Sequence, residues 1–199
     1  MNALTQEVTV IVAGSFGQEN LPFIQQEVAD AEQWGIRVVA PRFNTVRNPG
    51  DSFVVLDTDA ADASPRQLEQ SYMDKIAGAD ALVVVNHRRV GRVGMSAAAE
   101  MAHAALTGVP LVTTHSTRIT ERDYPDTYFS DEVTPAEQDA LHRVGSMVVN
   151  LAWPAPNLGY WLKLKERTSP MPTDHPDYAI LLGLRDRLLA SLPAEASAH

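Results

Sequence analysis

Cysteine is absent from this chain of 199 residues. Its absence excludes disulfide bonds, thiolate metal sites and cysteine nucleophiles. Long apolar runs are absent too, since stretches such as residues 81–85 are far too short to cross a bilayer. Residues 1–7 lack the basic flank and apolar core of a signal peptide, so we expect a cytoplasmic protein.

Basic residues are scarce relative to acidic ones. The chain has 16 Lys and Arg against 25 Asp and Glu, a formal net charge of −9. An acidic surface repels polyanions, so neither duplex nucleic acid nor a membrane is expected as a partner. A small anionic ligand stays compatible, because a local pocket can oppose the global charge. The 6 histidines include no pair four residues apart, so we expect no metal site.

Apolar segments alternate with helical patterns through the first 115 residues. Strands are expected over residues 8–13, 36–40, 81–85 and 109–114. Helices are expected between them, over residues 22–34, 65–77 and 96–108, with Ser96 as the N-cap of the third. Strand–helix alternation of this kind produces right-handed crossovers and a parallel sheet, and therefore predicts an α/β fold.

The pattern weakens after residue 115. We expect one helix over residues 135–150 and a last one over residues 177–192. The expected organisation is an α/β core over residues 1–115 and a C-terminal helical extension over residues 116–199 that packs on the same domain.

The loop after the first strand contains Gly14, Ser15 and Phe16. Ligands of parallel sheets bind at the C-terminal ends of the strands. Backbone N–H groups and the Ser15 hydroxyl in this loop suit a sugar or phosphate at a helix N-terminus, but an ordinary turn has the same composition. The loop matches neither a Walker loop nor a dinucleotide-binding fingerprint.

Glu100 lies about one turn inside an expected helix that is otherwise small and apolar. The positive end of that helix favours an ionised carboxylate there. From the pattern alone, a solvent-facing Glu100 is the more frequent arrangement, and a catalytic role is the alternative. His103 follows Glu100 by three residues and lies on the same face of the expected helix. It is either a packed or surface histidine or an acid/base group.

Three arginines precede this helix: Arg88, Arg89 and Arg92. Guanidinium groups bind phosphate through paired N–H donors, but a solvated loop or pairing with the protein's own carboxylates is the more frequent arrangement. Asp74, near the end of the second expected helix, is either a pocket group or a surface carboxylate.

Several short motifs occur in a specific order over residues 7–115. They are Gly14-Ser15-Phe16 after a strand, Gly35 to Pro41, Ile76 to Val85, Gly91-x-x-Gly94 before Ala99-Glu100-Met-Ala-His-Ala104, and Gly108-Val-Pro110. In this order and spacing the chain resembles the nucleoside 2-deoxyribosyltransferase-like superfamily. The resemblance implies a flavodoxin-like or Rossmann-like three-layer α/β fold.

The resemblance also implies an activity, the cleavage or exchange of N-glycosidic bonds in nucleosides or nucleotides. Glu100 matches the family's nucleophile, which forms a glycosyl-enzyme intermediate through an oxocarbenium-like transition state. Asp74 or His103 would donate the proton to the departing base. The expected substrate-binding residues are Gly14, Ser15, Phe16, Asn86, Arg88, Arg89, Arg92, Gly94 and Ser96. No cofactor is expected, and family members are commonly oligomers, so we expect a dimer or tetramer.

The chain departs from the family pattern in its pocket residues. Tyr72 stands where an aspartate is common, four residues before Ile76, and Asp74 lies two residues before it. Asn86, His87 and Arg88 occupy the place of a second pocket aspartate. These changes favour either a phosphorylated substrate or a non-catalytic nucleotide-binding or sensing module. A flavodoxin-like flavin binder is a third hypothesis.

Overall fold

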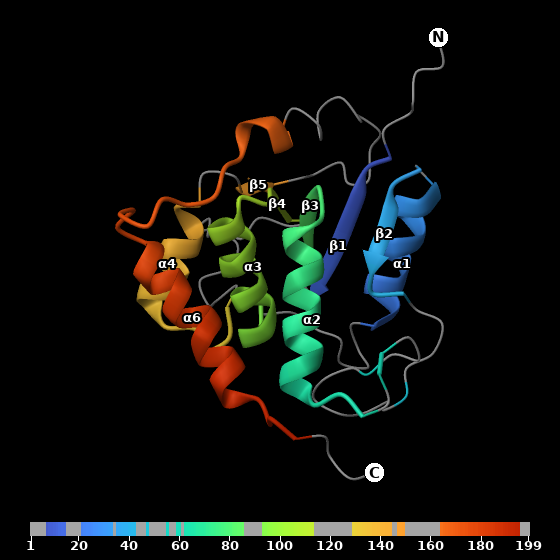
Figure 1. Ribbon diagram of the computed structural model, residues 1–199. Helices are drawn as coiled ribbons and strands as arrows, with labels where there is room; N and C mark the ends of the chain where they lie inside the picture. The colour runs from blue at the N-terminus through green and yellow to red at the C-terminus, as the bar shows by residue number, and fades with distance from the viewer. Residues whose placement is uncertain are drawn as a thin grey trace.

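A parallel sheet of 5 strands, in the order β2-β1-β3-β4-β5, forms the centre of the molecule (Figure 1). The strands are β1 (Thr9–Gly14), β2 (Arg37–Ala40), β3 (Ala81–Val85), β4 (Leu111–Thr113) and β5 (Met147–Val149). The helices are α1 (Leu21–Gln33), α2 (Pro65–Ala77), α3 (Met95–Thr107), α4 (Pro135–His142) and α6 (Tyr178–Ser191). The computed structural model describes residues 7–14, 21–33, 35–42, 47, 55, 59–60, 62–85, 93–113, 129–144, 147–149 and 164–195.

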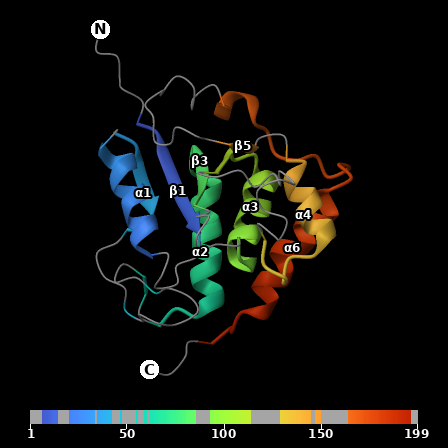
Figure 2. The same ribbon diagram turned by 180° about the vertical axis from the view of Figure 1, so that it is seen from behind.

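Helices cover both faces of the sheet, which confirms the predicted three-layer α/β fold (Figures 1 and 2). Successive strand residues point to opposite faces. Val10 and Val12 join the core beneath α1, whereas Ile11 and Ala13 join the core beneath α2, α3, α4 and α6. Strands buried on both faces have continuous apolar sequences, as all-parallel sheets require.

The two helices that follow β2 and β3 begin differently. Helix α2 starts with a capping box, in which the Ser64 hydroxyl accepts from the Gln67 amide and the Gln67 side chain accepts from the Ser64 amide. Helix α3 has Gly94 as its N-cap, and the prediction that Ser96 caps it is wrong. Gly94 already has extended backbone, and its carbonyl accepts from the Ala98 amide, so Ser96 lies exposed inside the first turn.

The prediction of one helix over residues 135–150 is wrong in its second half. Helix α4 ends at His142, and residues 147–149 form strand β5, which pairs in parallel with β4. The short apolar run there is compatible with either structure. Its partner decides the outcome, because β4 offers an open edge of backbone donors and acceptors.

The part of the chain after residue 115 therefore completes the sheet as well as covering it. Leu181, Leu184 and Leu188 of α6 are buried in the same core as α3. Two ion pairs join α6 and its start to α4, Arg187 to Glu137 and Arg143 to Asp177, each with an N–O distance of 2.6 Å.

In the part of the chain that the structure describes, no helix combines the length and apolar character needed to cross a membrane.

Candidate functional site

Glu100 is buried in the second turn of α3, with 5% of its surface exposed. Every residue from Ala97 to Leu106 is buried, so this helix is enclosed on all sides. The Glu100 Oε2 atom is buried and has no hydrogen-bond partner among the described residues. The solvent-facing arrangement, which the pattern alone favoured, is therefore wrong. A buried and unpaired carboxyl oxygen costs free energy, so its retention indicates a function.

A second carboxyl, Glu69 of α2, lies near enough to Glu100 to raise its pKa. Its Oε1 atom is likewise buried without a partner among the described residues. Burial raises the pKa of Glu69 from an ordinary 4.5 to about 7. Burial also raises the pKa of Glu100 well above its usual range, and the neighbouring charge of Glu69 raises it further. We call these two residues the acidic pair. Because two adjacent buried carboxylates repel each other, the acidic pair retains a proton near neutral pH.

Tyr72 lies beside the acidic pair and is anchored to the sheet. Its hydroxyl donates a hydrogen bond to the Val12 carbonyl of β1. Burial raises the pKa of Tyr72, and the nearby charges of Glu100, Glu69 and Asp59 raise it further. The phenol is thus neutral, and its single proton is engaged by the sheet rather than by the acidic pair.

The acidic pair lies where an α/β sheet usually binds ligands. Helix α1 covers one face and α2 the other, so the chain reverses direction across the sheet between β1 and β3 (Figures 1 and 2). Ligands bind at the C-terminal ends of the strands at such a switch point. Glu69 and Glu100 occupy the N-terminal halves of α2 and α3, which lie at that end of the sheet.

Asp74, one of the two proton donors expected from the sequence, lies away from the acidic pair. Its side chain is exposed and accepts a hydrogen bond of 3.3 Å from Gln70 on the outer side of α2. It does not contribute to the pKa shifts of Glu69 or Glu100. The structure therefore does not bring Asp74 together with the predicted nucleophile.

His103, the other expected proton donor, follows Glu100 by one turn and faces different neighbours. It is 8% exposed, and its ring nitrogens make no well-formed hydrogen bond with the described residues. Burial lowers the pKa of His103, and the Arg185 guanidinium of α6 lowers it further, against the opposing effects of the Met73 carbonyl and Asp74. His103 is accordingly a neutral imidazole between α3, α2 and α6.

Of the expected substrate-binding residues, the structure describes three, Gly14, Gly94 and Ser96. Gly14 ends β1, and a Cβ atom there would lie 3.0 Å from the Val85 carbonyl oxygen and 3.1 Å from the Ile24 side chain. Gly94, by contrast, has open space around its Cβ position, and Ser96 beside it is exposed. The others lie outside the described residues: Ser15, Phe16, Asn86, Arg88, Arg89 and Arg92.

Glu69 is not among the site residues predicted from the sequence. The available signal is its helical position, since Glu69 precedes Tyr72 by three residues and Met73 by four. That spacing places an acidic residue on the buried face of α2. Its partner Glu100 lies on another helix, so the sequence does not show that the two carboxyls meet.

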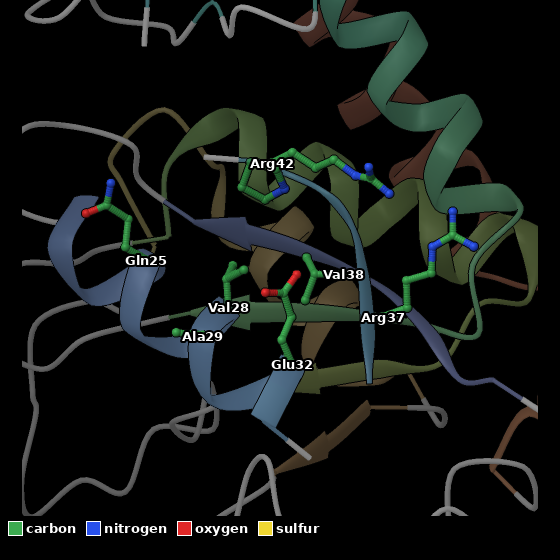
Figure 3. A pocket seen from close by; sticks show the side chains of 8 residues that line it. Gln25, Val28, Ala29, Glu32, Arg37, Val38 and Arg42 are labelled. Atoms are coloured by element: carbon green, nitrogen blue, oxygen red, sulfur yellow. The ribbon is translucent and has the colours of Figure 1, made fainter. Parts of the chain in front are cut away.

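A hollow of about 550 Å³ lies elsewhere, between α1 and β2 (Figure 3). Figure 3 shows the Glu32 side chain of α1 reaching toward Val38 of β2. The residues that line this hollow are Gln25, Val28, Ala29, Glu32, Arg37, Val38, Pro41 and Arg42. None of these eight carries a buried polar atom that lacks a hydrogen-bond partner. Arg37 pairs with Glu7 at 3.3 Å. The acidic pair is therefore the stronger candidate site.

Within the described ranges, no group of three His, Cys, Asp or Glu side chains is placed to hold a metal ion.

Comparisons with known proteins do not assign the chain to a family. No family model matches it, and no curated protein matches its sequence. A solved structure similar to it is the crystal structure of a conserved protein from Enterococcus faecalis V583. The identity is 17% and the TM-score 0.44, over 91% of this chain and 99% of that chain. That description names no activity, so the functional argument rests on the residues of this chain.

Proposed function

We propose that this protein cleaves the N-glycosidic bond of a nucleoside or nucleotide, with Glu100 as the nucleophile. The observation that carries the proposal is the buried Glu100 carboxyl at the switch point of the sheet, whose Oε2 atom has no hydrogen-bond partner among the described residues and whose pKa is raised by a second carboxyl. The motif order over residues 7–115, which resembles nucleoside 2-deoxyribosyltransferases, supports it independently.

The chemistry suits a buried carboxylate. As the bond between the anomeric carbon and the base nitrogen breaks, its electron pair leaves with the base and positive charge develops on the sugar. A carboxylate in a low-dielectric site stabilises that charge more strongly than it would in water. A Glu100 oxygen then bonds to the anomeric carbon and forms a glycosyl ester. Water or a second base attacks the same carbon, and the electron pair of the ester bond returns to Glu100.

Further features of the proposal rest on the resemblance. The partner would be a small-molecule nucleoside or nucleotide, and Arg88, Arg89 and Arg92 would contact a phosphate where one is present. The protein would be a cytoplasmic homo-oligomer, a dimer or a tetramer.

The test is base release from a panel of ribo- and deoxyribonucleosides and their 5′-monophosphates, separated by chromatography. We expect wild type to release base and Glu100→Gln to lose the rate by at least about a thousandfold, as removal of a nucleophile does. Glu166→Gln makes the same chemical change at an exposed position and serves as the matched control. A second base in the mixture separates transfer from hydrolysis.

Two outcomes would contradict the proposal. Equal rates for wild type and Glu100→Gln would remove Glu100 from the mechanism. Saturable nucleotide binding by wild type without any base release would identify a non-catalytic binding module instead.

A further inference from the structure

We propose that Glu69 is the second catalytic residue of this site. Its carboxyl donates the proton that the departing base takes, and its carboxylate then accepts a proton from the water that releases the sugar. The inference rests on the proposed N-glycosidic function. It adds to that function a residue that neither the sequence pattern nor the resemblance assigned.

The first argument is geometric. Glu69 and Glu100 come from facing helices, and each has a buried oxygen without a hydrogen-bond partner among the described residues. Glu100 is 95% buried, since its exposed fraction is 5%. Of the charged groups in the described residues, Glu69 is the one that raises the pKa of Glu100, so the two carboxyls lie within electrostatic reach.

The other titratable groups near Glu100 are unsuited to donate a proton to the departing base. The Tyr72 proton is donated to the Val12 carbonyl. Asp74 is exposed and bonded to Gln70. His103 has a lowered pKa and lies toward Arg185, one turn further along α3. Among the described residues near Glu100, Glu69 is therefore the group left to hold a proton near neutral pH that is not already donated to another atom.

The transition state decides which carboxyl carries the shared proton. Positive charge develops on the anomeric carbon next to Glu100, so it favours an ionised Glu100 and a protonated Glu69. The glycosidic bond breaks toward the base, and the base nitrogen takes the Glu69 proton. The released base is neutral, and Glu69 is left ionised. In the second half, Glu69 takes a proton from water, the water oxygen bonds to the anomeric carbon, and Glu100 departs as a carboxylate.

The experiment compares guanosine with 7-methylguanosine, each as the ribo- and deoxyribonucleoside and as the 5′-monophosphate. The methylated base carries a fixed positive charge and departs without a proton, so it has no need of a general acid. We expect Glu69→Gln to lose about 10²- to 10⁴-fold in base release from guanosine, the usual contribution of a general acid. In the first turnover, before water releases the sugar, the same variant should stay within about tenfold of wild type on 7-methylguanosine.

The pH profile gives a second readout. Wild-type kcat/KM on guanosine should fall as pH rises through the pKa of Glu69, about 7. That fall should be absent in Glu69→Gln. The titratable and charged groups near Glu69 and Glu100 are Tyr72 and Asp59, with His103 and Arg185 one turn away. Since Tyr72 titrates well above the tested range, it does not contribute to this limb.

The outcomes separate this inference from the function on which it rests. Equal losses on both substrates, or no loss on either, would overturn the role of Glu69 and leave Glu100 untouched. Glu100→Gln should fail on both substrates, and Glu166→Gln on neither. Absence of base release by wild type from every probe would overturn the proposed function, and the role of Glu69 with it.

A measurement without turnover guards against a variant that folds poorly. Carbon-13 NMR of glutamate-labelled protein follows each side-chain carboxyl as pH changes. One carboxyl of the acidic pair should remain protonated at pH 7 in wild type. If both are ionised at pH 6, no proton is available for the base and the inference is wrong.

Discussion

The acidic residues at the two ends of the parallel strands have opposite environments. We call these ends the N-terminal edge and the C-terminal edge of the sheet. At the N-terminal edge, the Asp80 carboxylate accepts hydrogen bonds of 2.8 Å from both the amide and the hydroxyl of Thr9, and it pairs with Lys165. These partners lower the pKa of Asp80 despite its partial burial. At the C-terminal edge, Glu69 and Glu100 each have a buried oxygen that finds no partner in the described part of the chain, and burial raises the pKa of both. Similar side chains therefore stabilise one edge and destabilise the other.

The difference separates carboxyls that stabilise the fold from the two that we propose to act in catalysis. A fold under selection for stability alone pairs its buried charges or replaces them with apolar residues. Glu137 and Asp177 follow that rule through Arg187 and Arg143, and both have lowered pKa values. The acidic pair departs from it. Such a departure is common where a site must present an unpaired group to a substrate.

The largest expected effect comes from Gly108, at the end of α3 and on the N-terminal edge. Its φ is +77°, and an added Cβ would lie 2.6 Å from the Ser169 carbonyl carbon and closer still to the Pro170 nitrogen. Gly108→Ala should therefore lower the free energy of unfolding by about 4 kcal/mol, from left-handed strain plus overlap with backbone. Denaturant titration measures the loss.

Gly35→Ala is the matched control for Gly108→Ala. Gly35 has a similar φ of +74°, but nothing lies within 4 Å of its Cβ position. We expect about 1–2 kcal/mol there, the cost of the left-handed backbone alone. If both variants lose the same amount, the tight packing of α3 against residues 169–170 does not stabilise this edge.

The next largest effect is on the pH dependence of the free energy of unfolding, which should have its maximum near pH 5. Carboxyls of the C-terminal edge cause the loss above that pH, the alkaline limb, and carboxyls of the N-terminal edge cause the loss below it, the acid limb. Glu69 has a folded pKa of about 7 against an ordinary 4.5, so between these values the folded state binds more protons than the unfolded state. The free energy of unfolding should therefore fall as pH rises from 5 to 8, by about 3 kcal/mol. Glu69→Gln should reduce the slope of this limb in denaturant titrations at several pH values, and the slope that remains belongs to Glu100, whose pKa burial also raises.

The acid limb tests the other edge with the opposite sign. The pKa of Asp80 is lowered, so its stabilisation is complete above the unfolded pKa near 4 and is lost as pH falls through the folded pKa. Asp80→Asn should reduce stability at neutral pH and weaken the acid limb, leaving the alkaline limb as in wild type. Parallel profiles for Glu69→Gln and wild type between pH 5 and 8 would contradict the assignment of the alkaline limb.

Much of the fold follows from local sequence. The predicted boundaries of α2 and β3 match the observed ones, because Ser64 and Pro65 mark a helix start and a fully buried strand has a continuous apolar run. Strand β5 does not follow, because its three residues become a strand only by pairing with β4. The cap of α3 was misplaced since a glycine N-cap has no side chain to reveal it.

The candidate site was predictable in part. Glu100 stands out as a carboxylate within an alanine-rich helix, and the sequence identified it. Its burial and its proximity to Glu69 depend on how α2 packs against α3, which no local pattern encodes. Tyr72 was recognised only as a departure from the family pattern. Its bond to Val12 joins residues far apart in the sequence.

The smallest expected effect is at Tyr72. This residue is a polar group of the C-terminal edge that, unlike the acidic pair, donates a hydrogen bond to the sheet. Tyr72→Phe removes the donor to the Val12 carbonyl and keeps the ring. We expect a loss of about 1 kcal/mol in the free energy of unfolding, the usual net value of one hydrogen bond. Base release should fall by less than about tenfold, because a phenol that donates to the sheet has no proton for the departing base. A loss in base release comparable to that of Glu69→Gln would mean that Tyr72 leaves Val12 during the reaction, and the proton relay would then include the phenol between the two carboxyls.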